Sequence, residues 1–390
     1  MGGKLAVITI ALAALAGVAR ADDKPGKDAT VAGPPLDFIA DAKELLIVGA
    51  CADGTSSKVK PEIVAAHCKT VRAAQDDYKK TWINVAREFF AKLVPATAPK
   101  TIVYPFAGGD LASALTVFPD ADEITTLSLE PAGDARALGR LDEKQIKASL
   151  QQVASELAFL YRASFSRTMN MIDAMRAGKL PTQLIFSLSA LWLHGYEPLS
   201  LRYFQLDKDG NIVYLTAADV ERIDKVKDVA THNRYFANVE LRFRKPGSKH
   251  EQVYRHILAN LDDAHIKASP AALKHLEKKG TVTGMTKAAS YLLSFGDFAT
   301  IRKYLMDHVT WMVSDTTGVP PEYGKPAGFD YEVWGEWVGA NMAAGNGAVA
   351  NQWRALFKSQ PARELPFRFG YPDAKLHGHL VVMKKAPPPK

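Results

Sequence analysis

Apolar residues in the first half of the chain recur at steps of three and four, which is typical of amphipathic helices. In 61–95 this face consists of Val71, Ala74, Tyr78, Trp82, Val85, Phe89 and Leu93. It predicts a long helix that docks on a core and ends at Pro95. A second face predicts a helix over about 143–177, ended by Gly178. The apolar segment 180–198 fits either a pair of strands or a buried helix.

Two short β-rich runs, "TIVYPF" at 101–106 and "EITTLSLEP" at 123–131, flank the helix-like run "DLASALTVF". A strand, a two-turn helix and a second strand in such close order predict a parallel pair with a crossover between them.

From 199 to 262 the pattern changes to short strands with turn signals at Asp209-Gly210 and Pro246-Gly247, which predict two hairpins. A helix over about 298–309, a strand "WMVSD" and a terminal hairpin within 365–385 are predicted to follow. The predicted fold is α/β, a degenerate, methyltransferase-like Rossmann domain. Its mostly parallel sheet carries an antiparallel insertion at about 199–262.

The N-terminal segment has the pattern of a signal peptide: Lys4, an apolar run and the tripeptide Ala19-Arg20-Ala21. We expect 1–21 to be removed, 22–36 to be a disordered linker, 37–385 to form one domain and 386–390 to be a loose tail. The apolar run is short for a membrane span, although an uncleaved anchor is the alternative. The mature protein is therefore expected to be periplasmic or secreted, without a stable membrane span.

The composition is that of a globular protein, with 47% apolar and 23% charged residues among 390. The formal net charge of +7 becomes +5 without Lys4 and Arg20, and the remaining basic residues are scattered among acids. This distribution argues against nucleic acid as a partner. Cys51 and Cys68 can pair in an oxidising compartment, adding about 3 kcal/mol of stability, or remain separate thiols.

The turn after the first predicted strand is the first candidate site. Gly108 and Gly109 would let backbone amides approach a ligand, and Glu130 lies where an acid commonly binds a ribose. The turn lacks the G-x-G-x-x-G pattern, however, and Asp110 places a negative charge where a phosphate would sit. A purely structural turn is the alternative to a nucleotide or S-adenosylmethionine site.

The second candidate is "SDTTGVP" at 314–320, where Asp315 and Thr316 would follow another strand. Asp315 and Asp110 could then share one rim of the sheet and hold a divalent metal or perform acid–base chemistry. In the alternative interpretation, Asp315 caps backbone amides in a turn completed by Gly318. Lys287 and Ser290 form a weaker candidate for a nucleophile and its base.

Taken in order, the blocks "YPFAGGD", "FPDADEITTLSLEPAG", "KAASYLL", "SDTTGVP" and Gly370-Tyr371 resemble those of a set of exported bacterial proteins of unknown function. The resemblance covers about 80–385 and implies a common fold and export. It implies no activity, and Thr316 stands where the resemblance leads us to expect an acidic residue.

Three functional hypotheses follow, and none identifies a cofactor or metal. The first is an envelope protein that binds a small molecule or protein partner in a crevice lined by Asp110, Glu130 and Asp315. The second is an exported metal-dependent hydrolase or transferase that uses Asp110 and Asp315. The third, which requires that the chain is not exported, is a methyltransferase-like enzyme.

Overall fold

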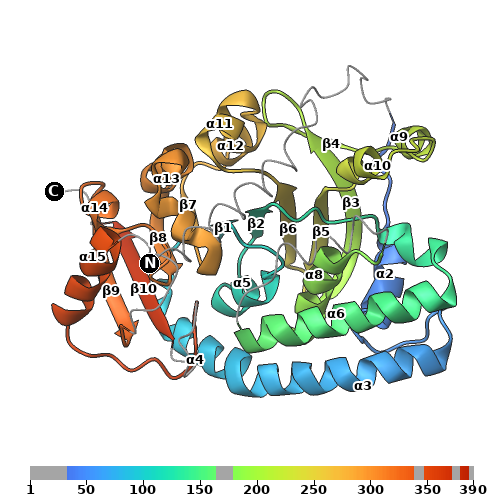
Figure 1. The fold of residues 1–390 in the computed structure, drawn as a ribbon, viewed down its shortest axis with the longest axis horizontal. Helices are drawn as coiled ribbons and strands as arrows, with labels where there is room; N and C mark the ends of the chain where they lie inside the picture. Colours follow the sequence, from blue (N-terminus) through green and yellow to red (C-terminus); the bar gives the residue numbers. More distant parts are fainter. Residues whose placement is uncertain (1–32, 164–178, 338–346, 371–377, 386–390) are drawn as a thin grey trace, which may run out of the picture.

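The computed structural model describes residues 33–163, 179–337, 347–370 and 378–385 (Figure 1). The predicted signal peptide, the first part of the linker, the tail and the predicted helix beyond Ala163 lie outside these residues. At the start of the described chain, the Leu36 amide donates to the Leu215 carbonyl at 2.8 Å. The chain is therefore already attached to the domain inside the segment predicted to be a linker.

A ten-stranded sheet forms the centre of the molecule, in the order β4-β3-β5-β6-β2-β1-β7-β8-β10-β9. Five neighbours in its middle run parallel: β6 (Glu251–Leu258), β2 (Glu123–Ser128), β1 (Thr101–Pro105), β7 (Val282–Met285) and β8 (Val309–Ser314). The α/β class is confirmed, and so is the parallel pair β1–β2, which is joined through α5 (Leu111–Val117). The sheet as a whole is mixed, because antiparallel strands extend it on both sides.

One antiparallel extension consists of β3 (Glu197–Leu206), β4 (Ile212–Tyr214) and β5 (Asn238–Arg244). The two predicted hairpins are confirmed as β3–β4 and β5–β6. β6 also pairs in parallel with β2, so the predicted insertion continues the main sheet. The helices α9 (Ala217–Ile223) and α10 (Val229–Tyr235) lie between β4 and β5.

The other extension consists of β10 (His379–Lys385), which lies between β8 and the edge strand β9 (Phe329–Gly335). The predicted terminal hairpin is wrong, because Leu365–Gly370 contains no strand and β10 pairs with β8 and β9. The outer edge of β9 is covered: Gln360 Nε2 donates to the Tyr331 carbonyl at 2.7 Å.

Helices cover both faces of the sheet (Figure 1). On one face lie α2 (Ile39–Val48), α3 (Pro61–Tyr78), α4 (Asn84–Leu93), α6 (Glu143–Ala163) and α8 (Thr182–Leu193). On the other lie α11 (Asp263–Ala268), α12 (Ala271–Glu277), α13 (Ala299–His308) and α15 (Gly347–Lys358), with the short α14 (Pro321–Gly324) beside them. Successive side chains of β1 point to opposite faces of the sheet, so Tyr104 packs in the core on one face and Val103 in the core on the other.

The first predicted helix is confirmed as α3 and α4, but a π-helical turn at Lys79–Ile83 joins them. The ambiguous segment 180–198 resolves into the buried helix α8 and the start of β3. None of the helices in the described ranges is long and apolar enough to cross a membrane.

Candidate functional site

The predicted glycine turn lies between β1 and α5, and it is buried. Gly108 has a φ of +56°, and Phe106, just before it, also has a left-handed φ of +59°. Asp110 is the N-cap of α5, and its Oδ1 accepts a hydrogen bond from the Ser113 amide at 3.2 Å. Because Gly108, Gly109 and Asp110 are all buried, the turn faces the interior of the protein.

Asp110 also forms an ion pair with Lys287, and the two side chains are only 2% and 1% exposed. Tyr104 donates its hydroxyl to Asp110 Oδ2 at 3.1 Å, and Lys287 Nζ donates to Ser113 Oγ at 2.7 Å. Burial, followed by the charge of Asp110, raises the pKa of Tyr104 well above its usual range. The Ser290 hydroxyl donates to the Lys287 carbonyl at 3.3 Å and not to this ammonium group. The weaker Lys287–Ser290 candidate thus receives no support from this geometry.

Asp315 and Thr316 lie at the end of β8 and are fully buried. Asp315 Oδ1 accepts the Thr317 amide at 2.9 Å, and Oδ2 accepts the Ala288 amide at 3.1 Å. Thr316 Oγ1 lies 2.6 Å from His379 Nε2. These contacts are the ones expected of an aspartate that caps backbone amides.

Glu130 follows β2 and is 1% exposed. Its carbonyl lies 2.5 Å from His256 Nε2. The structure thus connects Asp110 with Lys287, and Asp315 with Ala288, the residue next to Lys287, whereas Glu130 belongs to the β2–β6 side of the sheet.

Several unusual backbone features surround the Asp110–Lys287 pair. Phe106 and Ala288 both have left-handed φ values, +59° and +58°, and lie one and three residues beyond the adjacent strands β1 and β7. The π-helical turn carries Trp82, whose ring centre lies 5.8 Å from Lys287 Nζ. Strained residues and π-helical turns are frequent at functional sites. Here, however, the charged groups are buried and bonded to one another, so the geometry supports a rigid scaffold better than an open reaction site.

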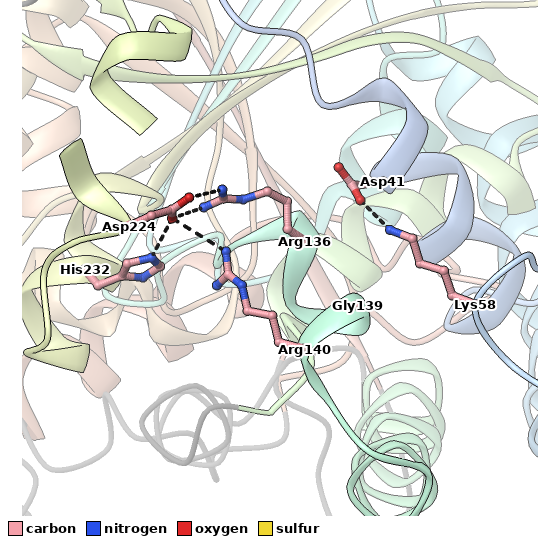
Figure 2. Close-up of a pocket in the computed structure, with 7 residues that line it drawn as sticks. All are labelled: Asp41, Lys58, Arg136, Gly139, Arg140, Asp224 and His232. Carbon is pink, nitrogen blue, oxygen red and sulfur yellow. Dashed lines mark hydrogen bonds and ion pairs between the residues drawn. The ribbon is translucent and has the colours of Figure 1, made fainter. Parts of the chain in front are cut away.

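A cavity of about 590 Å³ lies instead along the chain that leaves β2, among α2, α9 and α10 (Figure 2). We call it the arginine cleft, and it is lined by Asp41, Lys58, Arg136, Gly139, Arg140, Asp224 and His232. A second cavity of about 270 Å³ shares Arg140 and His232 with it. None of the six residues predicted to bind a ligand (Gly108, Gly109, Asp110, Glu130, Asp315 and Thr316) lines either cavity.

Arg136 is fixed from several directions. Its Nη1 and Nη2 donate to both oxygens of Asp224 at 2.8 and 2.9 Å, and its Nε and Nη2 donate to Asp134 at 3.0 and 2.8 Å. The guanidinium also lies 4.9 Å from the centre of the Phe236 ring. The hydrogen bonds from Arg136 lower the pKa of Asp224, so this acid is charged at neutral pH.

Arg140 is held less completely and is the more accessible arginine. One of its nitrogens, Nη2, lies 2.6 Å from Asp134 and 3.9 Å from Asp224, and the side chain is 44% exposed. Across the cleft, Lys58 and Asp41 form an ion pair at 2.6 Å (Figure 2). The cleft therefore presents charges of both signs to a ligand, with Arg140 offering a partly exposed guanidinium.

Sequence reasoning missed this cleft, although a signal for it was present. In "EPAGDARALGR" the acid Asp134 stands two residues before Arg136, and Arg140 follows one helical turn later, just after a predicted strand. This arrangement favours an N-cap that also binds both arginines. The other lining residues, Asp41, Lys58, Asp224 and His232, are distant in sequence and gave no local pattern.

The predicted disulfide between Cys51 and Cys68 is present, with the two Cα atoms 5.3 Å apart. Comparisons of the chain with models of protein families, with curated proteins and with solved structures gave no match. The resemblance to exported bacterial proteins thus stays a prediction.

Proposed function

We propose that this protein is an exported envelope protein that binds a small polar molecule in the arginine cleft, on a degenerate Rossmann-type sheet. Export is supported by the signal-like N-terminus and by the disulfide, which is typical of oxidising compartments. The Rossmann-type assignment is supported by the parallel strands β1 and β2, which are joined through α5.

One observation carries the proposal: the cleft is open and charged, whereas Asp110 and Asp315 are buried, the first in an ion pair and the second on backbone amides. A pocket of several hundred Å³ with a few convergent polar groups is the usual form of a small-molecule site. The cleft offers about 590 Å³ and follows the carboxyl end of β2, the sheet edge at which α/β proteins commonly bind ligands.

The charges of the cleft favour a ligand with an anionic oxygen group. Arg140, at 44% exposed, and Lys58, at 34% exposed, could bind a carboxylate or phosphate by charge-assisted hydrogen bonds. Asp41 and Asp224 could accept hydrogen bonds from hydroxyl or ammonium groups of the same molecule. Arg136 would act as a fixed wall, because Asp134 and Asp224 already hold it on two sides.

The two enzymatic alternatives receive less support. A metal-dependent hydrolase needs Asp110 and Asp315 to face water, yet they are 2% and 0% exposed. A methyltransferase-like site needs the glycine turn to meet a cofactor, yet Gly109 approaches Phe186 so closely that an added Cβ would lie 2.5 Å from its ring.

The test starts from protein purified from its own envelope. Native mass spectrometry is expected to detect a bound small molecule, and denaturation should release it for identification. Titration calorimetry with the identified compound then compares the wild type with Arg140→Gln and with Asp110→Asn. Because a charge-assisted hydrogen bond is worth roughly 1.5–3 kcal/mol, Arg140→Gln should weaken binding at least about tenfold.

Arg354→Gln is the matched control, since Arg354 is exposed on α15 and bonds only Asn351 in the described chain. It should bind like the wild type. The proposal fails if no small molecule accompanies the protein, or if Arg140→Gln binds as tightly as the control. Loss of binding in Asp110→Asn alone, with the fold intact by circular dichroism, would move the site to the glycine turn.

A further inference from the structure

Three side chains outside both sites described above form a compact cluster of metal-ligating type. Sulfur atoms of Cys51 and Cys68 and a ring nitrogen of His67 all lie within 4.8 Å of one another. The residues are 0%, 6% and 8% exposed, respectively. In the oxidised protein the sulfurs are joined and are not available as thiolate ligands.

The loop that carries Cys51 is anchored independently of the disulfide. Side chains of α3 bind three consecutive carbonyl groups of this loop. His67 Nε2 lies 3.0 Å from the Gly49 carbonyl, Gln75 donates to Ala50 at 3.0 Å, and Arg72 donates to Cys51 at 3.2 Å. Reduction removes none of these bonds, so the two cysteines should remain next to each other when the disulfide opens.

The two ring nitrogens of His67 have different surroundings. Its Nε2 can donate to the Gly49 carbonyl, which fixes the tautomer and ring position. Its Nδ1 is buried and makes no well-aligned hydrogen bond within the described chain, although the Leu150 backbone lies close to the ring. With Nε2 donating to a carbonyl, Nδ1 carries the lone pair of the neutral ring, so it is the nitrogen that would bind a cation.

We propose that the reduced Cys51–His67–Cys68 cluster is a binding site for a zinc-like cation, and that the disulfide closes it. Two thiolates and an imidazole are the ligands that Zn²⁺ and related borderline or soft cations prefer, and three protein ligands leave a fourth position for water. Cys51 has a left-handed φ of +63°, a backbone conformation that is unusual for a residue other than glycine.

Opening the site needs a dithiol reductant. A thiolate of the reductant attacks Sγ of Cys68, the more exposed of the two residues, forms a mixed disulfide and releases Cys51 as a thiolate. The second thiol of the reductant then displaces Cys68 and leaves as a cyclic disulfide. The protein gains two electrons and two protons, and binding of the cation to the two sulfurs releases these protons to solvent.

The test uses the full mature chain and Co²⁺ as the probe. One sample is reduced with dithiothreitol and desalted without oxygen, and the other stays oxidised. The reduced wild type should bind one equivalent of Co²⁺ with a thiolate-to-cobalt absorption band, and Zn²⁺ should displace it. The oxidised protein should show no such band. A reduced wild type without the band overturns the proposal, whatever the variants do.

His67→Gln keeps a side chain that can reach the Gly49 carbonyl but lacks the imidazole. In the reduced state it should bind Co²⁺ at least about tenfold more weakly than the wild type. His275→Gln is the matched control, because His275 is also 8% exposed and also bonds one backbone carbonyl, that of Gly210. Equal affinity of His67→Gln and His275→Gln would show that the histidine is not a ligand and would overturn the three-ligand site.

Discussion

Lys287 and Asp110 form a buried ion pair beyond the carboxyl ends of β7 and β1. The pair joins two parts of the sequence that are far apart, since Lys287 begins the turn after β7 and Asp110 begins α5. It is also surrounded by aromatic rings, with Lys287 Nζ 5.6 Å from the centre of Phe369. We interpret it as the polar centre that fixes the β1 and β7 turns relative to each other.

Replacing Lys287 with methionine should destabilise the fold strongly. The substitution keeps most of the volume but leaves the Asp110 carboxylate buried without its cation, which typically costs about 3–5 kcal/mol. Urea unfolding followed by circular dichroism measures the change. The double variant Lys287→Met/Asp110→Asn should recover part of the loss, because no buried charge remains.

The matched control for this pair is Lys303→Met. Lys303 pairs with Asp307 across one turn of α13, but the two side chains are 75% and 51% exposed. Such a surface pair contributes less than about 1 kcal/mol. If Lys287→Met cost no more than Lys303→Met, the Asp110–Lys287 pair would have no special role in the fold.

The backbone of Gly370 packs so closely against Asp315 that no side chain fits between them. A Cβ at Gly370 would lie 1.9 Å from Asp315 Oδ2, and the φ of +71° is itself unfavourable for alanine. Gly370→Ala should therefore displace the carboxylate from the Ala288 and Thr317 amides and cost about 3 kcal/mol or more. The unfolding free energy from urea titration gives the measurement.

Gly247→Ala is the matched control for Gly370→Ala, because it introduces the backbone strain of a left-handed φ without a steric clash. Gly247 has a similar φ of +78°, but no atom lies within 4 Å of its added Cβ. We expect a loss of about 1 kcal/mol from the left-handed conformation alone. Equal losses in the two variants would contradict the role assigned to Gly370.

Much of the fold was predictable because local patterns and tertiary structure agree. The α3–α4 apolar face, the β1–α5–β2 unit and the turns at Asp209-Gly210 and Pro246-Gly247 each show their structure in a few neighbouring residues. The order of the outer strands was not predictable in this way. β10 lies between β8 and β9 because of long-range pairing, and the run around Phe367 resembles a strand without finding a partner strand.

The sequence predicted where the candidate acids lie along the strands, but not which side chains would surround them in the folded chain. The sequence places Asp110 and Asp315 after strands, and the structure agrees. It could not show that Lys287 would neutralise Asp110, since the ammonium group reaches it from a turn more than 170 residues away. For the same reason the arginine cleft was missed, because its walls meet only in the folded chain.

Removing the disulfide should lower stability measurably. Cys51 and Cys68 are 17 residues apart in sequence, and a loop of this length constrains the unfolded chain by about 3 kcal/mol. The double variant Cys51→Ser/Cys68→Ser should lose roughly that amount in urea unfolding. Adding dithiothreitol should destabilise the wild type but leave the double variant unchanged; a variant that still responded to the reductant would contradict the assignment.

The last prediction concerns acid and the ion cluster around Glu123. Glu123 is partly desolvated, which alone would raise its pKa, but Lys279 and Arg255 outweigh this and lower the pKa from 4.5 to about 2. Arg255 Nη1 lies 2.5 Å from its carboxylate, and Lys279 also contacts it. Because the folded-state pKa lies below that of the unfolded chain, the carboxylate stabilises the fold above about pH 4.5. This contribution is lost as the pH falls toward 2.

The test compares the wild type with Glu123→Gln from pH 7 to pH 3. The pH-dependent part of the difference in unfolding free energy should be on the order of 3 kcal/mol at pH 7 and fall by roughly half at pH 3. Glu143→Gln is the control, since Lys147 and Lys60 also lower the pKa of Glu143 to about 2, but at a fully exposed position. Its effect should be much smaller and should fade in high salt, because solvent and ions screen it. A flat pH profile for Glu123→Gln relative to the wild type would show that the buried cations do not hold this carboxylate in its charged form.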